Sequence, residues 1–391
     1  MRAQQRNDFN PSCDIALLEG TLQNYDWGGL TNIANFEGRK PSGQPEAERW
    51  YGTHPSGPAF IGGQELTELI EDNPACTLGP GSSEQDLPFL VKLLDSAQPL
   101  SLQAHPDRKQ AKAGFAREIN EQTPPDCRNY RDPNAKPEVI IALSELWAVA
   151  GFRSPVEVAN LIRDLRIAEL DTELQILESD MPDARKFEHI LRDWLTHDTG
   201  SRHAALTSAC DVYEGSSPVT LAYLHIARQI DNAFPGDVGL LIALLLNCVR
   251  LAPGQALYTP PNTLHAYIRG FGLEVMASSD NVLRCAMTSK RRDIAELMRV
   301  VDFSPTTPEL IDPFSPGGYQ AKAFRIEMFR TSTEISHRGP RMLVVTKGNL
   351  KIDNREFDAG DVVWIPHVAG PQRVDTLDAE YALISDPSCA G

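Results

Sequence analysis

Four side chains have the types and spacing of a metal site: Gln103, His105, Glu138 and His265, each in a segment predicted as a β-strand or a strand end. Residues i and i+2 of an extended strand point to the same face, so Gln103 and His105 can reach one cation together. Nitrogen from His and oxygen from carboxylate or amide suit zinc, and a catalytic zinc site keeps one position open. Without sulfur ligands, the set also suits Mn²⁺, Fe²⁺ or Co²⁺. Each histidine taken alone is more often structural.

A cluster of basic residues forms a second feature: Arg284, Lys290, Arg291 and Arg292 lie within nine residues. The whole chain has a net charge of −16, from 37 Lys and Arg against 53 Asp and Glu, which disfavours nucleic acid and anionic membranes as partners. An anionic small molecule would therefore need a local cluster of bases. The alternative is a solvated helix start, which is the ordinary explanation of a charge run.

His54 lies in "AERWYGTHPSGPA", a loop flanked by Gly and Pro that could line a cleft. The alternative is a plain turn residue. The histidines of the predicted helical region lack the i, i+4 pairing of helical metal motifs, and we interpret them as structural or exposed. They are His189, His197, His203 and His225.

The length of 391 residues predicts two or three domains with a sizeable core. No apolar run reaches the roughly 20 residues of a membrane helix, and "VGLLIALLLNCV" is interpreted as a buried helix. The seven cysteines are scattered and contain no C-x-x-C pair, which argues against disulfides and favours a reducing compartment. The N-terminal residues lack the apolar segment of a secretory signal. We therefore expect a cytoplasmic protein.

The residue pattern divides the chain into four parts. Residues 1–153 are rich in Gly, Pro and short apolar runs, which predicts an N-terminal β-rich part. Residues 154–250 change to helical spacing and predict an α-helical insertion. Residues 251–320 return to the strand pattern of the first part, and residues 321–391 predict a separate C-terminal jelly roll.

Two helix starts are specific predictions. "HPDRKQAKAGFAREINEQ" predicts a polar helix directly after the Gln103 strand, with Pro106 in its first turn. The insertion is expected to begin with Ser154 as N-cap and Pro155 behind it. The insertion separates Glu138 from His265, so the fold must bring these two residues back together.

A weak internal repeat supports two related β units. Gly254 to Pro260 and Gly360 to Pro366 each run from Gly through five residues to Pro. "LVVTKGNLKIDNREFDAGDVVWIP" predicts three strands joined by turns at 347–349 and 358–360. The predicted fold class is therefore mainly β, with two jelly-roll β domains and an α-helical domain.

The chain resembles the type I phosphomannose isomerases, or mannose-6-phosphate isomerases, which are zinc enzymes of the cupin superfamily. The resemblance covers residues 22 to about 292, and the C-terminal jelly roll agrees in pattern more than in identity. It rests on the motifs "LQNYDWGG", "AERWYGTHPSGPA", "PFLVKLLDSAQPLSLQAHPD", "NAKPEVIIAL", "VAGF" and "YTPPNTLHAYIRGFGLEVMASSDNVLR".

The resemblance implies a role for each site residue. One zinc ion per chain would be held by the four residues named first, Gln103, His105, Glu138 and His265. The family's catalytic arginine falls on Arg284, and Lys290 is expected to hold the phosphate with Arg284 nearby. Ser101 and Lys136 match positions near the substrate. The implied reaction interconverts mannose 6-phosphate and fructose 6-phosphate.

Such an isomerisation moves a proton between C2 and C1 through an enediolate, whose charge a metal and a fixed guanidinium stabilise. Arg284 stays protonated and is no base. The candidates for the base are Lys136 and Glu274, then His54 or metal-bound water. Without the resemblance, Lys136 would be interpreted as a solvated lysine before Pro137, and Glu274 as a strand carboxylate paired with Arg269.

Several alternatives stay open at this stage. The site could serve another phosphorylated aldose, the chain could be a non-catalytic sugar-phosphate-binding protein, or the metal could be purely structural. The stretch "RCAMTSK" departs from the family at Cys285, Ala286 and Ser289, which puts the Lys290 loop in question. A sugar phosphate is the only partner expected, and the protein is expected to be a monomer.

Overall fold

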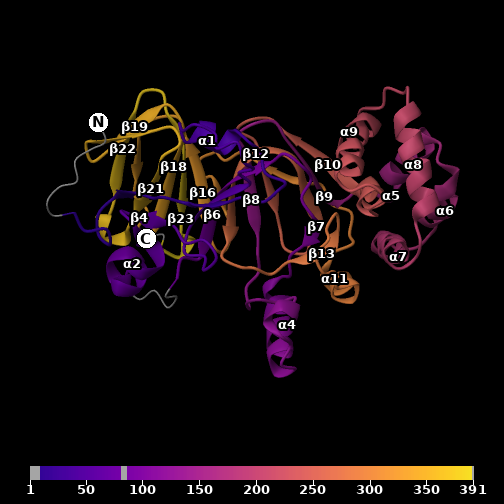
Figure 1. The fold of residues 1–391 in the computed structure, drawn as a ribbon, viewed down its shortest axis with the longest axis horizontal. Coiled ribbons are helices and arrows are strands. Elements are labelled where there is room, and N and C mark those ends of the chain that lie inside the picture. Colours follow the sequence, from indigo (N-terminus) through magenta and orange to yellow (C-terminus); the bar gives the residue numbers. More distant parts are fainter. Residues whose placement is uncertain (1–8, 81–85, 390–391) are drawn as a thin grey trace.

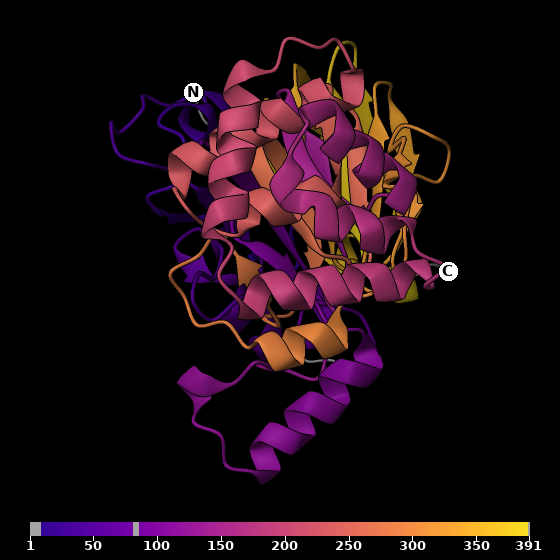
Figure 2. The ribbon, with the colours of Figure 1, turned by 90° about the vertical axis from the view of Figure 1, so that its right-hand side faces the viewer.

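The computed structural model describes residues 9–80 and 86–389. Strands fill the left and centre of the molecule, and the helices that follow residue 154 cover its right-hand end (Figure 1). Seen from that end, these helices lie in front of the sheets, and α4 (Arg108–Asn120) projects from the body (Figure 2). The predicted class, mainly β with a helical segment, is confirmed.

An eleven-stranded sheet occupies the centre and carries most of the candidate site residues. Its main path runs β14-β11-β8-β12-β6-β3-β2, and β7, β9, β10 and β13 attach beside β12 and β9. The strands are β2 Thr21–Gln23, β3 Glu48–Tyr51, β6 Phe89–Ser96, β7 Leu102–Ala104, β8 Glu138–Ala142, β9 Leu146–Phe152, β10 Leu246–Leu251, β11 Ala256–Thr259, β12 His265–Ala277, β13 Leu283–Ala286 and β14 Glu309–Ile311.

Strand β12 joins two parts of this sheet. Its residues 265–269 pair with β7 and β9, whereas residues 270–277 pair with β6 and β8. The change falls at Gly270, where φ is +138° and a Cβ atom would lie 2.6 Å from the Glu145 carbonyl oxygen. Only glycine fits this conformation and this close approach. The bend separates the beginning of the strand, which carries His265, from its continuation, which carries Glu274.

The C-terminal part supplies most strands of a six-stranded sheet, β1-β21-β18-β23-β16-β15, whose edge strand β1 comes from near the N-terminus, and it forms a four-stranded sheet, β17-β22-β19-β20. Buried residues of the six-stranded sheet, among them Met342 and Trp364, share one apolar core with Val91 and Leu273 of the central sheet. The two sheets are therefore held together by side chains from facing surfaces. The strands are β1 Ala16–Leu17, β15 Tyr319–Gln320, β16 Arg325–Phe329, β17 Thr333–Ile335, β18 Arg341–Lys347, β19 Asn349–Ile352, β20 Arg355–Asp358, β21 Val362–Ile365, β22 Gln372–Thr376 and β23 Glu380–Ser385; β4 Phe60–Ile61 pairs with β5 Gln64–Glu65.

The internal repeat has matching geometry in the two β units. Gly254 and Gly360 both have positive φ, and β11 and β21 end directly before Pro260 and Pro366. The prediction of three strands over this C-terminal stretch is wrong, because four are present, β18 to β21. The additional turn at 353–354 has φ of 52° and 63°, a conformation that Asp and Asn accept more readily than most residues.

Six helices lie between β9 and β10. The first, α5, begins at Pro155 with Ser154 as N-cap, as predicted, and Glu157 completes a capping box. Their apolar faces build the largest buried cluster together with residues of β7, β9, β12 and β13. The six helices are α5 Pro155–Leu165, α6 Asp171–Glu178, α7 Asp183–Thr196, α8 Gly200–Val212, α9 Pro218–Ala233 and α10 Gly239–Leu245. The limits of the four predicted parts stay a prediction.

Two helix predictions need correction. Only the first half of "VGLLIALLLNCV" is helical, because α10 ends at Leu245 and the chain continues as β10 along β9. Strand pairing therefore overrides the helical spacing there. Pro106 lies outside α4, whose N-cap is Asp107. The remaining helices are α1 Asn32–Phe36, α2 Leu66–Asp72, α3 Pro74–Thr77 and α11 Ile294–Val300, with 3₁₀ turns η1 Pro125–Cys127, η2 Ala168–Leu170, η3 His367–Ala369 and η4 Pro387–Cys389.

All seven cysteines are free thiols. None of the helices within residues 9–80 and 86–389 has the length and apolar character needed to cross a bilayer.

Candidate metal centre and substrate site

The central sheet brings three predicted ligands together. His105 follows β7, Glu138 begins β8 and His265 begins β12, and one ligand atom of each lies within 4.8 Å of the others. All three residues are buried. Glu138 pairs with Thr259 of β11 and with Met276 of β12, so strand pairing closes the gap that the helices open in the sequence.

The two imidazoles are oriented in the same way. His105 Nδ1 lies 2.6 Å from the Asn281 carbonyl oxygen, and His265 Nδ1 lies 2.9 Å from that of Thr263. Because a carbonyl only accepts, each Nδ1 carries the hydrogen and each neutral ring presents the lone pair of Nε2. Both Nε2 atoms are buried, have no hydrogen-bond partner and lie 3.3 Å from oxygens of Glu138. Two lone pairs directed at a carboxylate need a cation between them, so the geometry fits a metal ion.

The charge states favour metal binding. Burial and the nearby Lys136 charge lower the pKa of His105 to about 4, which keeps the ring neutral near pH 7. Burial alone would raise the pKa of Glu138, but the Lys136 ammonium and the His105 ring outweigh it and hold this pKa well below its ordinary value. A neutral imidazole and an ionised carboxylate are the forms that bind a metal.

Gln103 and Arg284 extend the site across neighbouring strands. On β7, Gln103 stands directly opposite His265 of β12 and directly opposite Arg284 of β13. Opposite residues of an antiparallel pair project to the same face, so the three side chains form one row. The half-buried Arg284 therefore belongs to the face that carries the metal ligands.

Lys136 and Glu274 are both buried, so the interpretation of Lys136 as a solvated lysine is wrong. Its Nζ lies 2.9 Å from Glu138 Oε1. Glu274 pairs with Lys92 at 3.3 Å instead of with Arg269, and Lys92 lies 3.5 Å from Glu48 on its other side.

Sequence reasoning missed Lys92 as a functional residue. The signal was a single lysine at the centre of the apolar run "PFLVKLL" on β6, where every residue is buried. A buried lysine needs acidic partners, and an isolated charge in such a strand is therefore a marker of a site.

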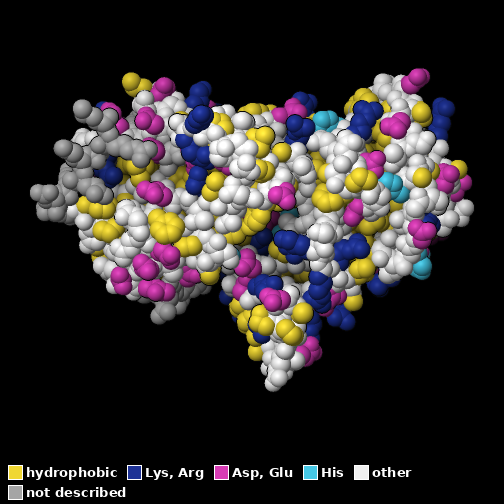
Figure 3. Space-filling model, viewed as in Figure 1, with side chains coloured by type: hydrophobic (Ala, Val, Ile, Leu, Met, Phe, Trp, Pro, Cys, Tyr) yellow, Lys and Arg dark blue, Asp and Glu magenta, His cyan; other side chains and the backbone are white. Residues whose placement is uncertain are grey.

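A second missed residue joins the basic cluster. Arg131, Arg284 and Lys290 have no ion-pair partner in the described part of the chain. Burial and the Arg131 charge lower the pKa of Arg284, and burial and the Arg284 charge lower the pKa of Lys290. Lys and Arg side chains gather on the surface above α4, near β13 and α11 (Figure 3). Arg291 and Arg292 are exposed before α11, as the helix-start interpretation predicts for them. Three cations without an ion-paired carboxylate offer a place for an anion.

His54 and Ser101 lie in less decisive positions. His54 Nε2 lies 3.0 Å from both carboxylate oxygens of Asp280, which follows β12, and its ring meets Trp50 edge-on at 4.7 Å. Its loop is therefore tied to the β12–β13 connection. Ser101 is partly exposed directly before β7, two residues from Gln103. Cys285 and Ala286 are buried in β13, and the loop that follows them carries Lys290.

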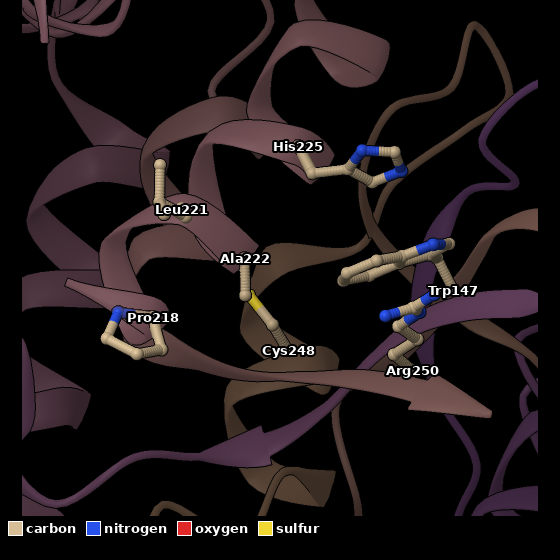
Figure 4. Close-up of a pocket in the computed structure, with 7 residues that line it drawn as sticks. All are labelled: Trp147, Pro218, Leu221, Ala222, His225, Cys248 and Arg250. Atoms are coloured by element: carbon tan, nitrogen blue, oxygen red, sulfur yellow. The ribbon is translucent and has the colours of Figure 1, made fainter. Parts of the chain in front are cut away.

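Two surface hollows lie elsewhere, beside α9. One of about 450 Å³ is bordered by Trp147, His225 and Arg250, with Cys248 and residues of α9 (Figure 4). A neighbouring hollow of about 370 Å³ shares Trp147 and His225. Trp147 is already covered by His225, at a ring distance of 4.3 Å, and by the Arg250 guanidinium. Neither hollow includes a residue of the candidate site. The buried metal-ligand group therefore locates the candidate active site, and the hollows do not.

Stacked β sheets with a buried His-Glu-His group beside unpaired cations define a cupin-type metalloenzyme. A model of the phosphomannose isomerase type I catalytic domain matches residues 15–155. The chain is 36% identical over 315 residues to the mannose-6-phosphate isomerase of Escherichia coli K12, which covers 77% of this chain and 78% of the relative. The chain belongs to the mannose-6-phosphate isomerase family.

Further comparisons cover nearly the whole chain. Mannose-6-phosphate isomerase 1 of Arabidopsis thaliana is 30% identical over 401 residues, 96% of this chain and 86% of that protein. A crystal structure of a phosphomannose isomerase mutant from Salmonella typhimurium has a TM-score of 0.85 and 30% identity, covering 95% of this chain and all of its own. A mannose 6-phosphate isomerase bound with zinc and yttrium has a TM-score of 0.83, 30% identity, and covers 95% of this chain and 99% of its own.

Proposed function

We propose that this protein is a zinc-dependent aldose-ketose isomerase that interconverts mannose 6-phosphate and fructose 6-phosphate. The observation that carries the proposal is the row of His265, Gln103 and Arg284 on adjacent strands, with two free imidazole Nε2 atoms facing Glu138. A site that only stored a metal would not need a guanidinium without a carboxylate partner beside it.

In this proposal one zinc ion is held by Gln103, His105, Glu138 and His265. A bound zinc supplies Lewis acidity that polarises a sugar oxygen and stabilises developing negative charge. Because Glu138 is the single anion among these ligands, the centre keeps a net positive charge. Lys136 stays 2.9 Å from Glu138, where it orients the carboxylate.

The phosphate is assigned to the basic cluster, with Lys290 as its main contact and Arg284 nearby. Lys290 and Arg284 have no ion-paired carboxylate among the described residues, so the phosphate can bind them, and this remote binding energy can orient the sugar. His54 and Ser101 are assigned to the sugar's surroundings. Arg284 belongs to the basic cluster and lies on the sheet face that carries the metal ligands, so it would stabilise the enediolate oxygen.

The proton transfer is assigned to Glu274, with Lys136 as the second candidate. A carboxylate takes the proton from C2 of the open-chain aldose to form the enediolate, the hydroxyl proton of O2 passes to O1, and the first proton returns at C1 to give the ketose. Burial raises the pKa of Glu274 while Lys92 lowers it, and a raised pKa suits a group that must both accept and return a proton. Lys136 is already engaged with Glu138.

The test is an isomerase assay with mannose 6-phosphate before and after chelation, with solvent deuterium exchange at C2 as a second readout. We expect turnover that chelation removes and zinc restores. Turnover without metal would contradict the metal role, and a folded, zinc-loaded protein without turnover would support a sugar-phosphate-binding protein. Equal C2 exchange with glucose 6-phosphate would overturn specificity for mannose.

We further propose that the protein works in the cytoplasm as a monomer. The free thiols support a reducing compartment. Light scattering of the purified chain tests the oligomeric state.

A further inference from the structure

Asn281 lies between β12 and β13 and is completely buried. We infer that Asn281 is a positioning residue that links the metal ligand His105 to an anion-binding cation, Arg131. The inference rests on the proposed function, because it assigns Arg131 to the phosphate of the same substrate. No step of the proposed chemistry uses either residue directly.

The contact with the metal face is made by the backbone of Asn281. Its carbonyl oxygen accepts a hydrogen bond of 2.6 Å from His105 Nδ1. This contact sets the tautomer and the angle of the ring, and outer partners of this kind commonly change metal affinity when they are disturbed. The position of this carbonyl in turn depends on how the Asn281 side chain is held.

The side chain of Asn281 holds the loop that carries Arg131. Its Oδ1 accepts from the backbone N–H groups of Arg131, at 2.7 Å, and Asp132, at 3.3 Å. Its Nδ2 donates to the backbone oxygens of Asp132, at 2.9 Å, and Asn134, at 2.8 Å. One amide therefore fixes both ends of the 131–134 turn.

The chemistry of this position favours asparagine. The position needs an acceptor for two N–H groups and, in the same plane, a donor for two carbonyl oxygens. A carboxylate could provide the acceptor but not the donor. The Asp132 carboxylate strengthens the same link, since it accepts from Ser279 Oγ and from the Asp280 backbone N–H. The turn and the β12–β13 connection thus behave as one unit.

Arg131 is an exposed cation at the edge of this unit. Its side chain has no ion-pair partner among the residues that the structure describes, and its charge adds to burial in lowering the pKa of Arg284. The hydrogen bond from the Arg131 backbone N–H to Asn281 Oδ1 places this turn beside the segment that carries Arg284, three residues further on, and then Lys290. A phosphate placed among Arg131, Arg284 and Lys290 would relieve the repulsion between these cations. The 131–134 turn determines the position of Arg131 in this group.

The experiment compares Asn281→Ala, Arg131→Gln and the double variant by zinc affinity, KM for mannose 6-phosphate and melting temperature. We expect Asn281→Ala to weaken zinc binding about 10- to 100-fold and to raise KM, whereas Arg131→Gln raises KM roughly tenfold and leaves zinc affinity unchanged. The double variant should have the KM of Arg131→Gln, because a cation that is absent cannot be misplaced.

The matched control is Asn73→Ala, which removes the N-cap of α3, far along the chain from the site. It should lower the melting temperature and leave KM and zinc affinity unchanged. The inference is overturned if Asn281→Ala behaves like this control, or if the KM effects of the two single variants multiply in the double variant.

Two further measurements keep the inference testable. If Asn281→Ala does not fold, Asn281→Ser keeps a polar side chain at this buried position and loses the amide donor pair to the Asp132 and Asn134 carbonyls, and the same comparison applies to it. If the wild-type protein shows no turnover, the proposed function fails, but the affinities for zinc and for inorganic phosphate, measured by calorimetry, still test whether Asn281 couples the two sites.

Discussion

Lys92 and Glu274 stand directly opposite each other on β6 and β12, and Lys92 Nζ lies 3.3 Å from Glu274 Oε2. Both side chains are buried. Burial raises the pKa of Glu274, and Lys92 is the main group that opposes this rise. Lys92 is shared with Glu48 at 3.5 Å and lies 5.2 Å from the Trp50 ring centre. The protonation of the proposed base therefore depends on a lysine that takes no part in the proton transfer.

Replacing this lysine should shift the pH dependence of the reaction. In Lys92→Gln the favourable charge is lost, so the pKa of Glu274 rises further. The carboxylate is the active form and is lost as pH falls through its pKa, so a higher pKa moves the loss of activity to higher pH. We expect the acid limb of the kcat/KM profile to move upward by about one pH unit or more, the scale of one nearby opposite charge.

The control for this shift is Lys351→Gln, which removes an exposed lysine paired with Glu356 on the surface. Its profile should match that of the wild type. An unchanged acid limb in Lys92→Gln would show that Glu274 does not set it, and would shift the assignment of the base to Lys136.

Arg284→Ala should separate metal binding from catalysis. Arg284 has no hydrogen-bond or ion-pair partner in the described residues that its removal would strand, so the variant should fold and keep its zinc. Loss of a preorganised group that stabilises an oxyanion costs about 10² in turnover or more. Arg338→Ala, at an exposed position before β18, is the control and should keep the activity. A fully active Arg284→Ala protein would favour a purely structural metal.

Metal removal should destabilise the protein, because the buried group of His105, Glu138 and His265 would lose the cation that it binds. A ligand that binds only the folded state raises the free energy of unfolding by about 4 kcal/mol when its free concentration is 1,000 times Kd. We expect a chelator to lower the melting temperature of the wild type, and to have no such effect on His265→Ala, which lacks one buried ligand. Equal chelator effects on both proteins would place the stabilising metal elsewhere.

Local sequence rules predicted the parts of the site that depend on single segments. The i, i+2 spacing predicted one face for Gln103 and His105, and Gln103 stands opposite His265, which is grouped with His105. Away from the site, the Ser154 cap predicted the start of α5. The pairing of Lys92 with Glu274 was not predictable in the same way, because cross-strand register joins residues that are distant in sequence. The sequence analysis assigned Asn281 no role, and only the folded chain shows its contacts with the 131–134 turn.

The errors in the fold have a similar origin. The apolar run that contains α10 fits a buried helix or a buried strand, and pairing with β9 decides where the helix stops. The missed turn at 353–354 contains no glycine, so its positive φ values gave no clear signal in the sequence.

Gly114→Ala should destabilise α4 although alanine is the better helix former. In an exposed helix interior, alanine is favoured over glycine by about 1 kcal/mol. A Cβ atom at Gly114 would lie well inside van der Waals contact with the ring of Tyr130, which is 1% exposed and donates a hydrogen bond of 2.7 Å to Glu296. Overpacking of this kind costs about 1 to 3 kcal/mol, so the clash should outweigh the propensity.

Urea unfolding checks this balance as a lower midpoint at an unchanged slope. Ala113→Gly, at the exposed neighbouring position, gives the scale, because it should lose about 1 kcal/mol of propensity alone. A more stable Gly114→Ala protein would mean that the Tyr130 ring moves aside at little cost. Because Arg131 follows Tyr130 in the chain, a movement of the Tyr130 ring should displace the Arg131 cation and raise KM. The urea midpoint and KM of Gly114→Ala together therefore show whether the clash lowers stability or moves Tyr130.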